Sequence, residues 1–180
     1  MASEPAAAFD LPAALRAQGY ALRPEREDDL PFLLRLYGST REAELAPVPW
    51  SAEQKQAFVA SQFALQRHHY RTQIEGCRFA VIEHGGTPAG RLYLDARPTR
   101  LHIVDIALLP EWRGRGLGTA ILQALLAYGA ASGRAVDIFV ERFNPALRLY
   151  RRLGFVAFAE HDVFLEMEWL PDAAQLNTAS

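Results

Sequence analysis

The stretch Arg113-Gly114-Arg115-Gly116-Leu117-Gly118 constrains the fold more than any other part of the sequence. The preceding run, Leu101–Leu109, is nearly continuous in apolar character, which predicts a strand covered on both faces, and Pro110 ends it. Beyond Gly118, apolar residues recur on one helical face as far as Ser132. The sequence therefore predicts a strand, a glycine turn and a helix in direct succession.

Such a turn is suited to bind an anion. Glycines lack Cβ atoms, so the backbone can turn tightly and bring its N–H groups against a ligand. The first turn of the predicted helix adds free N–H donors and the positive end of the helix dipole, while Arg113 and Arg115 add positive charge. Together these features favour a phosphate group at this point.

A second segment with a distinctive pattern runs from Asn144 to Phe155. Asn144 is a good helix N-cap, Pro145 suits the first helical position and Gly154 suits the C-terminal end, which predicts a helix of about two and a half turns. The helix carries the pair Leu149-Tyr150 and is followed by Gly154-Phe155.

With both segments in this order and spacing, the chain resembles the GNAT superfamily of acetyl-CoA-dependent N-acetyltransferases from about Tyr20 to Trp169. The pyrophosphate loop of that family has Arg or Gln, two residues, Gly, one residue, then Gly or Ala, and residues 113–118 fit it at each position. The resemblance implies an α/β (α+β) fold of GNAT type. Its sheet is mixed and mostly antiparallel, with a central splayed pair of parallel strands and helices on both faces.

The resemblance also implies that acetyl-CoA is the acetyl donor. Its pantetheine arm would enter between the strands Leu101–Leu109 and Ala135–Val140, bound by backbone groups, with the Leu108 N–H available to polarise the thioester carbonyl. The spacing from Asn144 to Tyr150 is one residue shorter than in many relatives, which leaves the cofactor contact of Asn144 open. The implied cofactor-binding residues are Ile106, Leu108, Arg113, Gly114, Arg115, Gly116, Leu117, Gly118, Thr119 and Asn144.

Acetyl transfer to an amine also needs proton donors and acceptors. The resemblance makes Tyr150 the acid that protonates the departing thiolate, since a phenol within hydrogen-bond reach can donate to it. For the base, His102 occupies the strand position that carries a glutamate in some relatives, Glu141 ends the neighbouring strand, and a water chain is the third possibility. Strand alternation predicts that His102 shares a face with Ile106 and Leu108, and that Asp105 lies on the opposite face.

The remaining segments are compatible with one domain over residues 1–180, with a core of about 20–170 and loose ends at 1–12 and 172–180. A helix with Leu30, Leu33, Leu34 and Tyr37 on its buried face is predicted to precede a loop, Gly38–Trp50. Ser51 is predicted to cap a helix that runs to about His68 or Tyr70, with Phe58, Phe63 and Leu65 partly on one face. The other predicted strands are Tyr20–Arg23, Arg78–Glu83, Ala89–Asp95, Ala135–Val140, Phe155–Ala159 and Val163–Trp169.

Composition limits the partners. A net charge of −2, from 19 basic and 21 acidic residues of mixed order, argues against a surface for nucleic acid or anionic membranes. No window approaches a membrane span, and the single cysteine, Cys77, cannot form an intrachain disulfide, which fits a cytoplasmic protein. The pair His68-His69 has no ligands at zinc-site spacing, so no metal is expected.

The expected acceptor is a small-molecule amine or a peptide, and a homodimer is possible. In the family the acceptor enters opposite the cofactor, so Gly38–Trp50 and Glu160–Phe164 would border the opening. Acidic residues outnumber basic ones there and Trp50 is present, which favours a cationic acceptor, although the same residues would also suit ordinary solvated loops.

Two other functions stay open. A domain of this family can bind acetyl-CoA or a partner without turnover. A strand, glycine turn, helix and strand also describe half of a dinucleotide-binding oxidoreductase, but the third glycine, Gly118, comes one position too early for that fingerprint.

Overall fold

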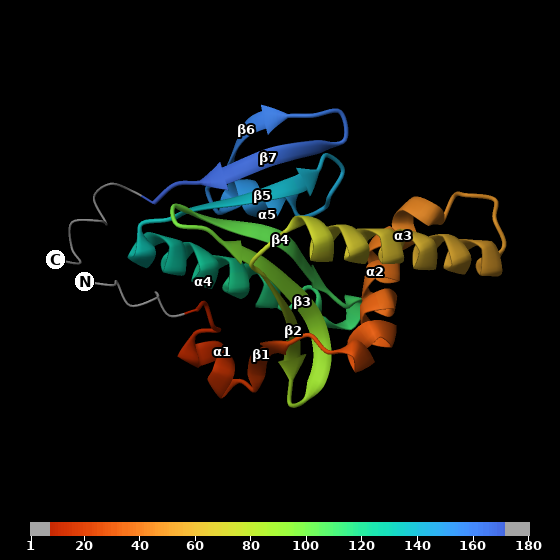
Figure 1. The fold of residues 1–180 in the computed structure, drawn as a ribbon, viewed down its shortest axis with the longest axis horizontal. Coiled ribbons are helices and arrows are strands. Elements are labelled where there is room, and N and C mark those ends of the chain that lie inside the picture. Colours follow the sequence, from red (N-terminus) through yellow and green to blue (C-terminus); the bar gives the residue numbers. More distant parts are fainter. Residues whose placement is uncertain (1–7, 172–180) are drawn as a thin grey trace.

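The computed structural model describes residues 8–171 as a seven-stranded sheet with helices on both faces (Figure 1). The strand order is β1-β2-β3-β4-β5-β7-β6. Its strands are β1 Tyr20–Pro24, β2 Cys77–His84, β3 Thr87–Ala96, β4 Arg100–Leu108, β5 Ala135–Glu141, β6 Val156–Glu160 and β7 Phe164–Trp169. The α-helices are α1 Ala13–Ala17, α2 Leu30–Leu45, α3 Ala52–Gln73, α4 Leu117–Ser132 and α5 Leu147–Arg152.

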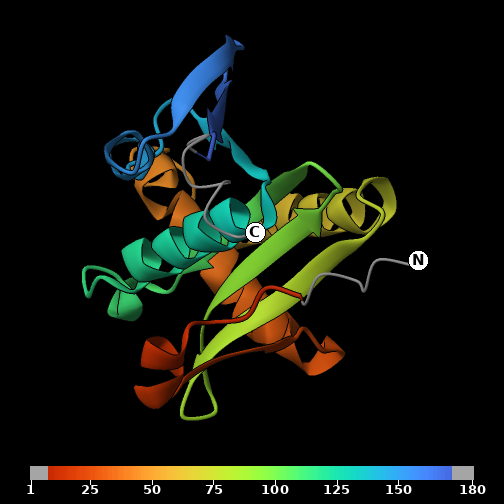
Figure 2. The same ribbon diagram turned by 90° about the vertical axis from the view of Figure 1, so that its left-hand side faces the viewer.

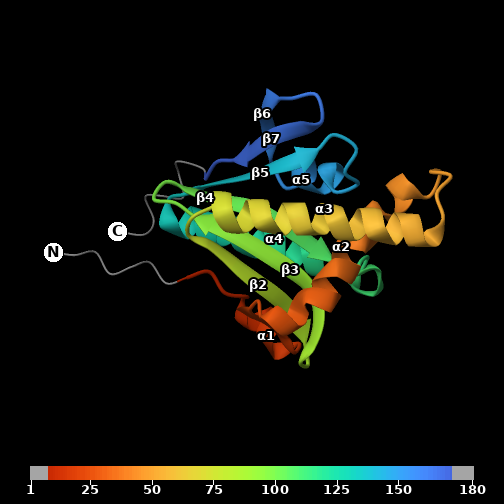
Figure 3. The ribbon, with the colours of Figure 1, turned by 45° about the vertical axis from the view of Figure 1, so that its right-hand side comes forward.

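Two apolar clusters hold the layers together. On one face, α4 buries Ile121, Leu122 and Leu125 against the sheet, and on the other, Tyr37 of α2 packs against Phe63 of α3. Figure 2 shows the strands between α4 on one side and α3 on the other. In Figure 3, α3 runs across β3 and β4, and the β6–β7 hairpin stands clear of it. The first cluster buries the apolar face of β4, whereas the second joins α2 to α3, and the α3 face of β4 carries the polar residues His102 and Asp105.

The centre of the sheet opens between β4 and β5. These strands are parallel, and their pairing begins at Arg100 with Ala135 and ends at Ile103 with Ile138. Every other pairing of strands within residues 8–171 is antiparallel. The mixed sheet with one parallel pair confirms the predicted fold class, and it excludes the wholly parallel sheet that the oxidoreductase alternative requires.

A β-bulge lies at the start of this opening. Tyr93 of β3 pairs with Asp105, and the next residue, Leu94, pairs with Ile103, so Val104 is the extra residue. A bulge of one residue reverses the alternation of side chains beyond it. The predicted parity of β4 is therefore wrong, with consequences for the site.

The predicted loop Gly38–Trp50 is wrong, because α2 continues to Leu45. Gly38 tolerates the helix and lets α3 approach, since a Cβ there would lie 3.4 Å from Val59. The hydroxyls of Ser39 and Thr40 donate to the carbonyls three residues earlier, at 2.7 Å each, so they do not break the helix. Its buried positions are Leu33, Leu36, Tyr37 and Leu45, whereas Leu30 and Leu34 are half-buried.

The capping prediction for α3 is confirmed. Ser51 Oγ accepts from the Gln54 N–H at 3.2 Å, and Gln54 Oε1 accepts from the Ser51 N–H at 2.9 Å. The helix runs on to Gln73, so the pair at 68–69 lies within it. Of the predicted apolar face only Phe63 is buried, while Phe58 and Leu65 are 38% and 61% exposed.

The N-terminal end of the predicted core differs from expectation within the described residues. Residues 1–12 were expected to be loose, but within the described part Phe9 and Leu11 are buried in the main cluster, and Arg78 donates to the Phe9 carbonyl. The expectation for residues 172–180 lies outside the described residues. No helix within residues 8–171 combines the length and the apolar character needed to cross a membrane.

The second motif folds slightly differently from its prediction. The helix α5 begins at Leu147, with Ala146 as N-cap. Asn144 Oδ1 accepts from the Ala146 N–H at 2.8 Å, so its side chain caps the turn before the helix. Gly154 has φ +96°, which confirms the predicted glycine end.

Candidate active site

The glycine turn leads directly into α4, and no other atoms crowd its backbone at the glycines. Gly114 and Gly116 have φ values of +69° and +80°, which glycine adopts without steric cost. A Cβ at either position would meet no heavy atom within 4 Å. No side chain caps the first turn of α4, so N–H groups at Leu117, Gly118 and Thr119 are available to an anion.

The two arginines of the turn contact other parts of the protein. Arg113 Nε donates to the Leu108 carbonyl at 2.8 Å, and its Nη2 donates to Ser39 Oγ at 2.9 Å. Arg115 lies over the Trp112 ring at 5.3 Å. Arg113 therefore ties the turn to the end of β4 and to α2, a role that the sequence pattern does not reveal.

The edge of β4 offers backbone groups to the gap. Leu109 N–H donates to the Ala89 carbonyl of β3 at 2.9 Å. Because backbone groups alternate in direction along a strand, the N–H groups of Leu108 and Ile106 point away from β3. They face the side where β5 has separated from β4. An extended amide-bearing ligand could pair with them as an added strand does.

Tyr150 lies in α5 with a nearly buried side chain, 3% exposed, whose ring meets Phe155 edge to face at 5.6 Å. Its hydroxyl makes no hydrogen bond within residues 8–171 and is not among their buried unpaired polar atoms, so it keeps contact with solvent. Burial raises the pKa of Tyr150, and the charge of Asp105 raises it further. The phenol is therefore protonated at neutral pH and is available as a hydrogen-bond donor.

His102 is buried on the face covered by α3. Its Nδ1 lies 3.1 Å from Asp137 Oδ2, and its ring packs edge to face on Phe139 at 4.9 Å. Ile106 and Leu108 instead join the cluster on the α4 face. The bulge thus puts His102 and Asp105 on one face, opposite to Ile106 and Leu108.

Glu141, at the end of β5, is held by α2. Arg41 Nη1 and Nη2 donate to its two carboxylate oxygens at 3.2 and 2.9 Å. Arg41 also pairs with Glu44 and lies over the Tyr37 ring at 5.4 Å. The carboxylate of Glu141 is therefore engaged in an ion pair that links α2 to β5.

Asp105 belongs to a polar cluster that the sequence interpretation missed. Its Oδ2 accepts from Tyr70 at 3.2 Å and from Arg91 at 2.8 Å. Arg91 in turn donates to Gln66 Oε1 at 2.9 Å. The available signal was one charged residue in the middle of each of two neighbouring strands, Arg91 in β3 and Asp105 in β4.

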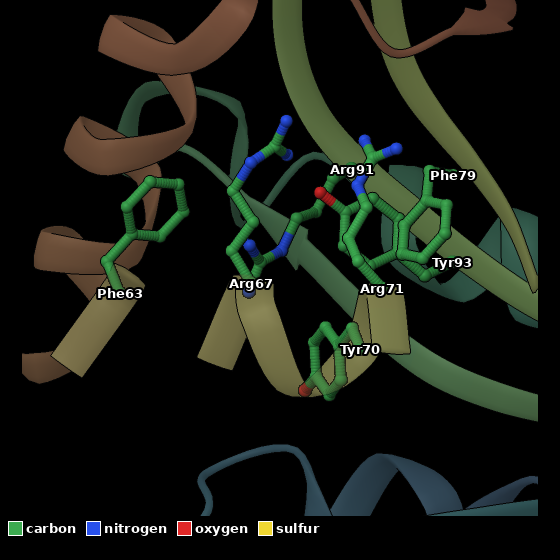
Figure 4. A pocket seen from close by; sticks show the side chains of 7 residues that line it. All are labelled: Phe63, Arg67, Tyr70, Arg71, Phe79, Arg91 and Tyr93. Atoms are coloured by element: carbon green, nitrogen blue, oxygen red, sulfur yellow. The ribbon is translucent and has the colours of Figure 1, made fainter. Parts of the chain in front are cut away.

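Three of the residues that line a small pocket beside this cluster hold a buried carboxylate. Figure 4 shows Arg67 and Arg71 of α3 near Tyr93, with the Tyr70 hydroxyl directed away from these arginines. All three of Arg67, Arg71 and Tyr93 donate to Glu25, whose side chain is fully buried. Burial alone would raise the pKa of Glu25, but these hydrogen bonds outweigh it and hold the pKa below its ordinary value.

The part of the chain that contains the glycine turn, the opened strand pair and the α5 tyrosine matches a known protein family. Residues 39–155 match the profile of the Acetyltransferase (GNAT) family, which covers more than half of the chain. The chain belongs to the GNAT family. The match spans both motifs, from before the glycine turn to Phe155.

Sequence relatives of this GNAT chain include several acetyltransferases. It is 27% identical to spermidine N(1)-acetyltransferase of Escherichia coli K12, over 85% of this chain and 82% of that protein. It is 30% identical to mycothiol acetyltransferase of Acidothermus cellulolyticus, over 66% of this chain and 38% of that protein. For four of the curated relatives the match spans only 34% to 60% of their length.

Solved structures support the GNAT fold. PaiA N-acetyltransferase from Thermoplasma acidophilum, solved in complex with coenzyme A, superposes with a TM-score of 0.62 at 16% identity, over 84% of this chain and 98% of that chain. The ribosomal L7/L12 alpha-N-protein acetyltransferase RimL, also solved with coenzyme A, gives 0.56 at 24% identity, over 92% and 99%. At these identities the likeness concerns the fold.

Proposed function

We propose that this chain transfers an acetyl group from acetyl-CoA to a primary amine. One observation carries the proposal. The free edge of β4, the open glycine turn and the uncapped start of α4 follow each other directly along the chain. An extended amide-bearing arm and a pyrophosphate need these two kinds of backbone donor side by side. Acetyl-CoA is a substrate that carries both groups.

The residues of the donor site follow from this unit. Backbone N–H groups of Ile106 and Leu108 would bind the pantetheine arm, and those of Gly114, Arg115, Gly116, Leu117, Gly118 and Thr119 would bind the pyrophosphate. Arg113 supports the loop through Leu108 and Ser39. Asn144 contributes by shaping the turn into α5, through its bond to the Ala146 N–H.

In the chemical step, the Tyr150 hydroxyl would donate to the sulfur as the carbon–sulfur bond breaks. The raised pKa of Tyr150 keeps the proton in place until the thiolate develops. His102 and Glu141 were the candidate bases, but each faces a protein partner, Asp137 and Arg41 respectively. This engagement argues against both residues as the base and leaves the water chain as the third possibility.

A cationic acceptor is the proposed class. Relatives include a protein named for spermidine, and a structural neighbour is named for the α-amino group of a ribosomal protein. Both acceptors carry amines that are protonated at neutral pH. On this chain, exposed Glu42 and Glu44 lie near the end of α2, and Trp50 packs edge to face on Phe58 at 5.3 Å.

The deciding experiment is an acetylation screen with release of the coenzyme A thiol as its readout. Polyamines, amino acids, aminoglycosides and short peptides are tested at fixed acetyl-CoA, and binding of acetyl-CoA and NAD is measured by calorimetry. We expect turnover of a cationic amine and at least tenfold tighter binding of acetyl-CoA than of NAD, a difference of about 1.4 kcal/mol. Binding without any turnover would identify a non-catalytic domain, and equal binding of NAD would contradict the assigned donor site.

A further inference from the structure

The carboxylate of Asp105 lies on β4 where this strand leaves β5. The last paired residues are Ile103 and Ile138, and the bulge at Val104 then turns Asp105 toward α3. Its side chain is 14% exposed. A partly exposed acid is thus placed at the inner end of the gap, on the face opposite α4.

Only one oxygen of this carboxylate is used by the protein. Oδ2 accepts from the Tyr70 hydroxyl and from Arg91 Nη2. Oδ1 accepts no hydrogen bond within residues 8–171, and it is not among the buried unpaired polar atoms of that part of the chain. It therefore keeps contact with solvent, so the site presents one open hydrogen-bond acceptor.

The partners of Oδ2 hold the carboxylate in a fixed orientation. Arg91 is itself 3% exposed, and it is tied to Gln66 of α3 and stacked over the Tyr93 ring at 5.0 Å. Burial raises the pKa of Tyr70, and the charge of Asp105 raises it further, so the phenol stays a donor. Groups from β3 and α3 thus orient Oδ1 before any substrate binds.

Tyr150 of α5 belongs to the main apolar cluster, against which Ile106 and Leu108 of β4 also pack. The charge of Asp105 contributes to the raised pKa of Tyr150, so the two groups are electrostatically coupled. Under the proposed function, a thioester bound along the edge of β4 would have Ile106 and Leu108, which pack with Tyr150, on one face of the strand and Asp105 on the other.

We propose that Asp105 is the catalytic residue that binds the amino group of the acceptor through Oδ1 and accepts its proton. The inference rests on the proposed function, because it requires an amine acceptor. Arg91 and Tyr70 are positioning residues, since they act through Asp105. The geometry selects acceptors whose reacting nitrogen can donate to a carboxylate, which fits a cationic primary amine and disfavours an anionic group at the reacting end.

The proton and bond changes balance in this scheme. The acceptor ammonium gives one proton to Asp105, which releases it to solvent. The neutral nitrogen attacks the thioester carbon, the nitrogen–carbon bond forms, and the carbon–sulfur bond breaks. The thiolate takes the proton of Tyr150, and the second proton lost by the nitrogen returns to the tyrosine. The products are the N-acetyl compound and the free thiol of coenzyme A.

The test compares Asp105→Asn with the wild-type chain, using the best acceptor among polyamines, amino acids, aminoglycosides and short peptides. We expect kcat/KM for the amine to fall about 100-fold or more, while the Kd for coenzyme A stays within twofold. Asp29→Asn is the matched control, because Asp29 is also a buried acid paired with an arginine, Arg23, but lies beside the edge strand β1. It should leave kcat/KM within threefold.

The outcomes separate this inference from the proposed function. If the wild type acetylates an amine and Asp105→Asn keeps its kcat/KM within threefold, the inference alone is overturned. If the wild type acetylates no amine, both the inference and the proposed function are overturned. If Asp105→Asn fails to fold, Tyr70→Phe decides, because it removes one hydrogen bond to Oδ2 and keeps the Arg91 pair. A rise in the amine KM of about fivefold with unchanged coenzyme A affinity supports the inference, and an unchanged amine KM refutes it.

Discussion

Arg41 and Glu141, 100 residues apart in sequence, are joined by two hydrogen bonds, at 2.9 and 3.2 Å, that fasten α2 to the end of β5. The arginine side chain is 24% exposed and the glutamate 57% exposed. The pair closes one side of the region where β5 ends. The pair also engages the carboxylate of Glu141, which is a candidate base because it lies at the end of β5.

We predict that Glu141→Gln lowers kcat by less than tenfold, and that Arg41→Gln has a similar effect. Removal of a general base would lower kcat by about 100-fold or more. Removal of an exposed ion pair would instead lower the free energy of unfolding by about 1 kcal/mol or less. Steady-state kinetics and urea unfolding of both variants and of the double variant provide the measurement. A loss of 100-fold confined to Glu141→Gln would restore its role as base.

We predict that Gly118→Asp weakens coenzyme A binding at least tenfold, about 1.4 kcal/mol, while Gly118→Ala leaves it within threefold. A Cβ at this position would make an ordinary contact, 3.8 Å from Leu108 Cδ1, so neither variant is blocked at its Cβ. A carboxylate in the first turn of α4 favours the helix dipole but repels a pyrophosphate. Calorimetry with coenzyme A and thermal unfolding are the two measurements. Equal affinities in the two variants would place the pyrophosphate elsewhere. Gly116 is a poorer choice, because φ +80° strains any other residue.

We predict that Tyr150→Phe lowers kcat by about 10²–10⁴ and changes acetyl-CoA affinity little, because the variant loses only the hydroxyl. Phe keeps the ring contact with Phe155, so the Tm should change by a few degrees at most. Single-turnover release of the thiol isolates the chemical step. Turnover at the wild-type rate would limit Tyr150 to packing.

We predict that Glu25→Gln destabilises the fold by about 3 kcal/mol at neutral pH, because it leaves Arg67 and Arg71 without their shared carboxylate. The pKa of Glu25 is lower in the folded chain than its ordinary value of 4.5. Its contribution is therefore fully present above that value and is lost as pH falls through the lower folded pKa.

The difference in unfolding free energy between wild type and Glu25→Gln should stay constant from pH 7 to about pH 5.5 and shrink below the ordinary pKa of 4.5. Urea unfolding at a series of pH values measures it. Asp28→Asn, at an exposed position in the neighbouring helical turn, is the control for removal of a carboxylate. A difference that is independent of pH would contradict the lowered pKa.

Local chemistry determined most of the elements before any tertiary contact was considered. The glycine turn, the apolar run before it and the amphipathic stretch after it predicted β4 and α4 to within a residue at most boundaries. Ser51 predicted the start of α3, because a hydroxyl and Gln54 satisfy each other's backbone donors locally. Such signals act over a few residues, so the sequence carries them directly.

Long-range packing overruled local signals elsewhere. Gly38, Ser39 and Thr40 are weak helix formers, yet α2 passes through them because it packs on α3 at Val59. Phe9 and Leu11 lie in a segment that the sequence predicts to be a loose end, but both are buried in the main apolar cluster.

The sequence by itself predicted the glycine turn on which the proposed donor site of this GNAT chain rests, since backbone donors at such a turn depend mainly on local conformation. The tertiary structure alone revealed the surroundings of Asp105, which carry the proposed acceptor side. An unpaired residue at Val104, set by pairing with β3, moved Asp105 to the face of α3 and brought Tyr70 and Arg91 to it. Strand parity cannot reveal a bulge, because the extra residue depends on the register of the partner strand and leaves no local mark in the sequence.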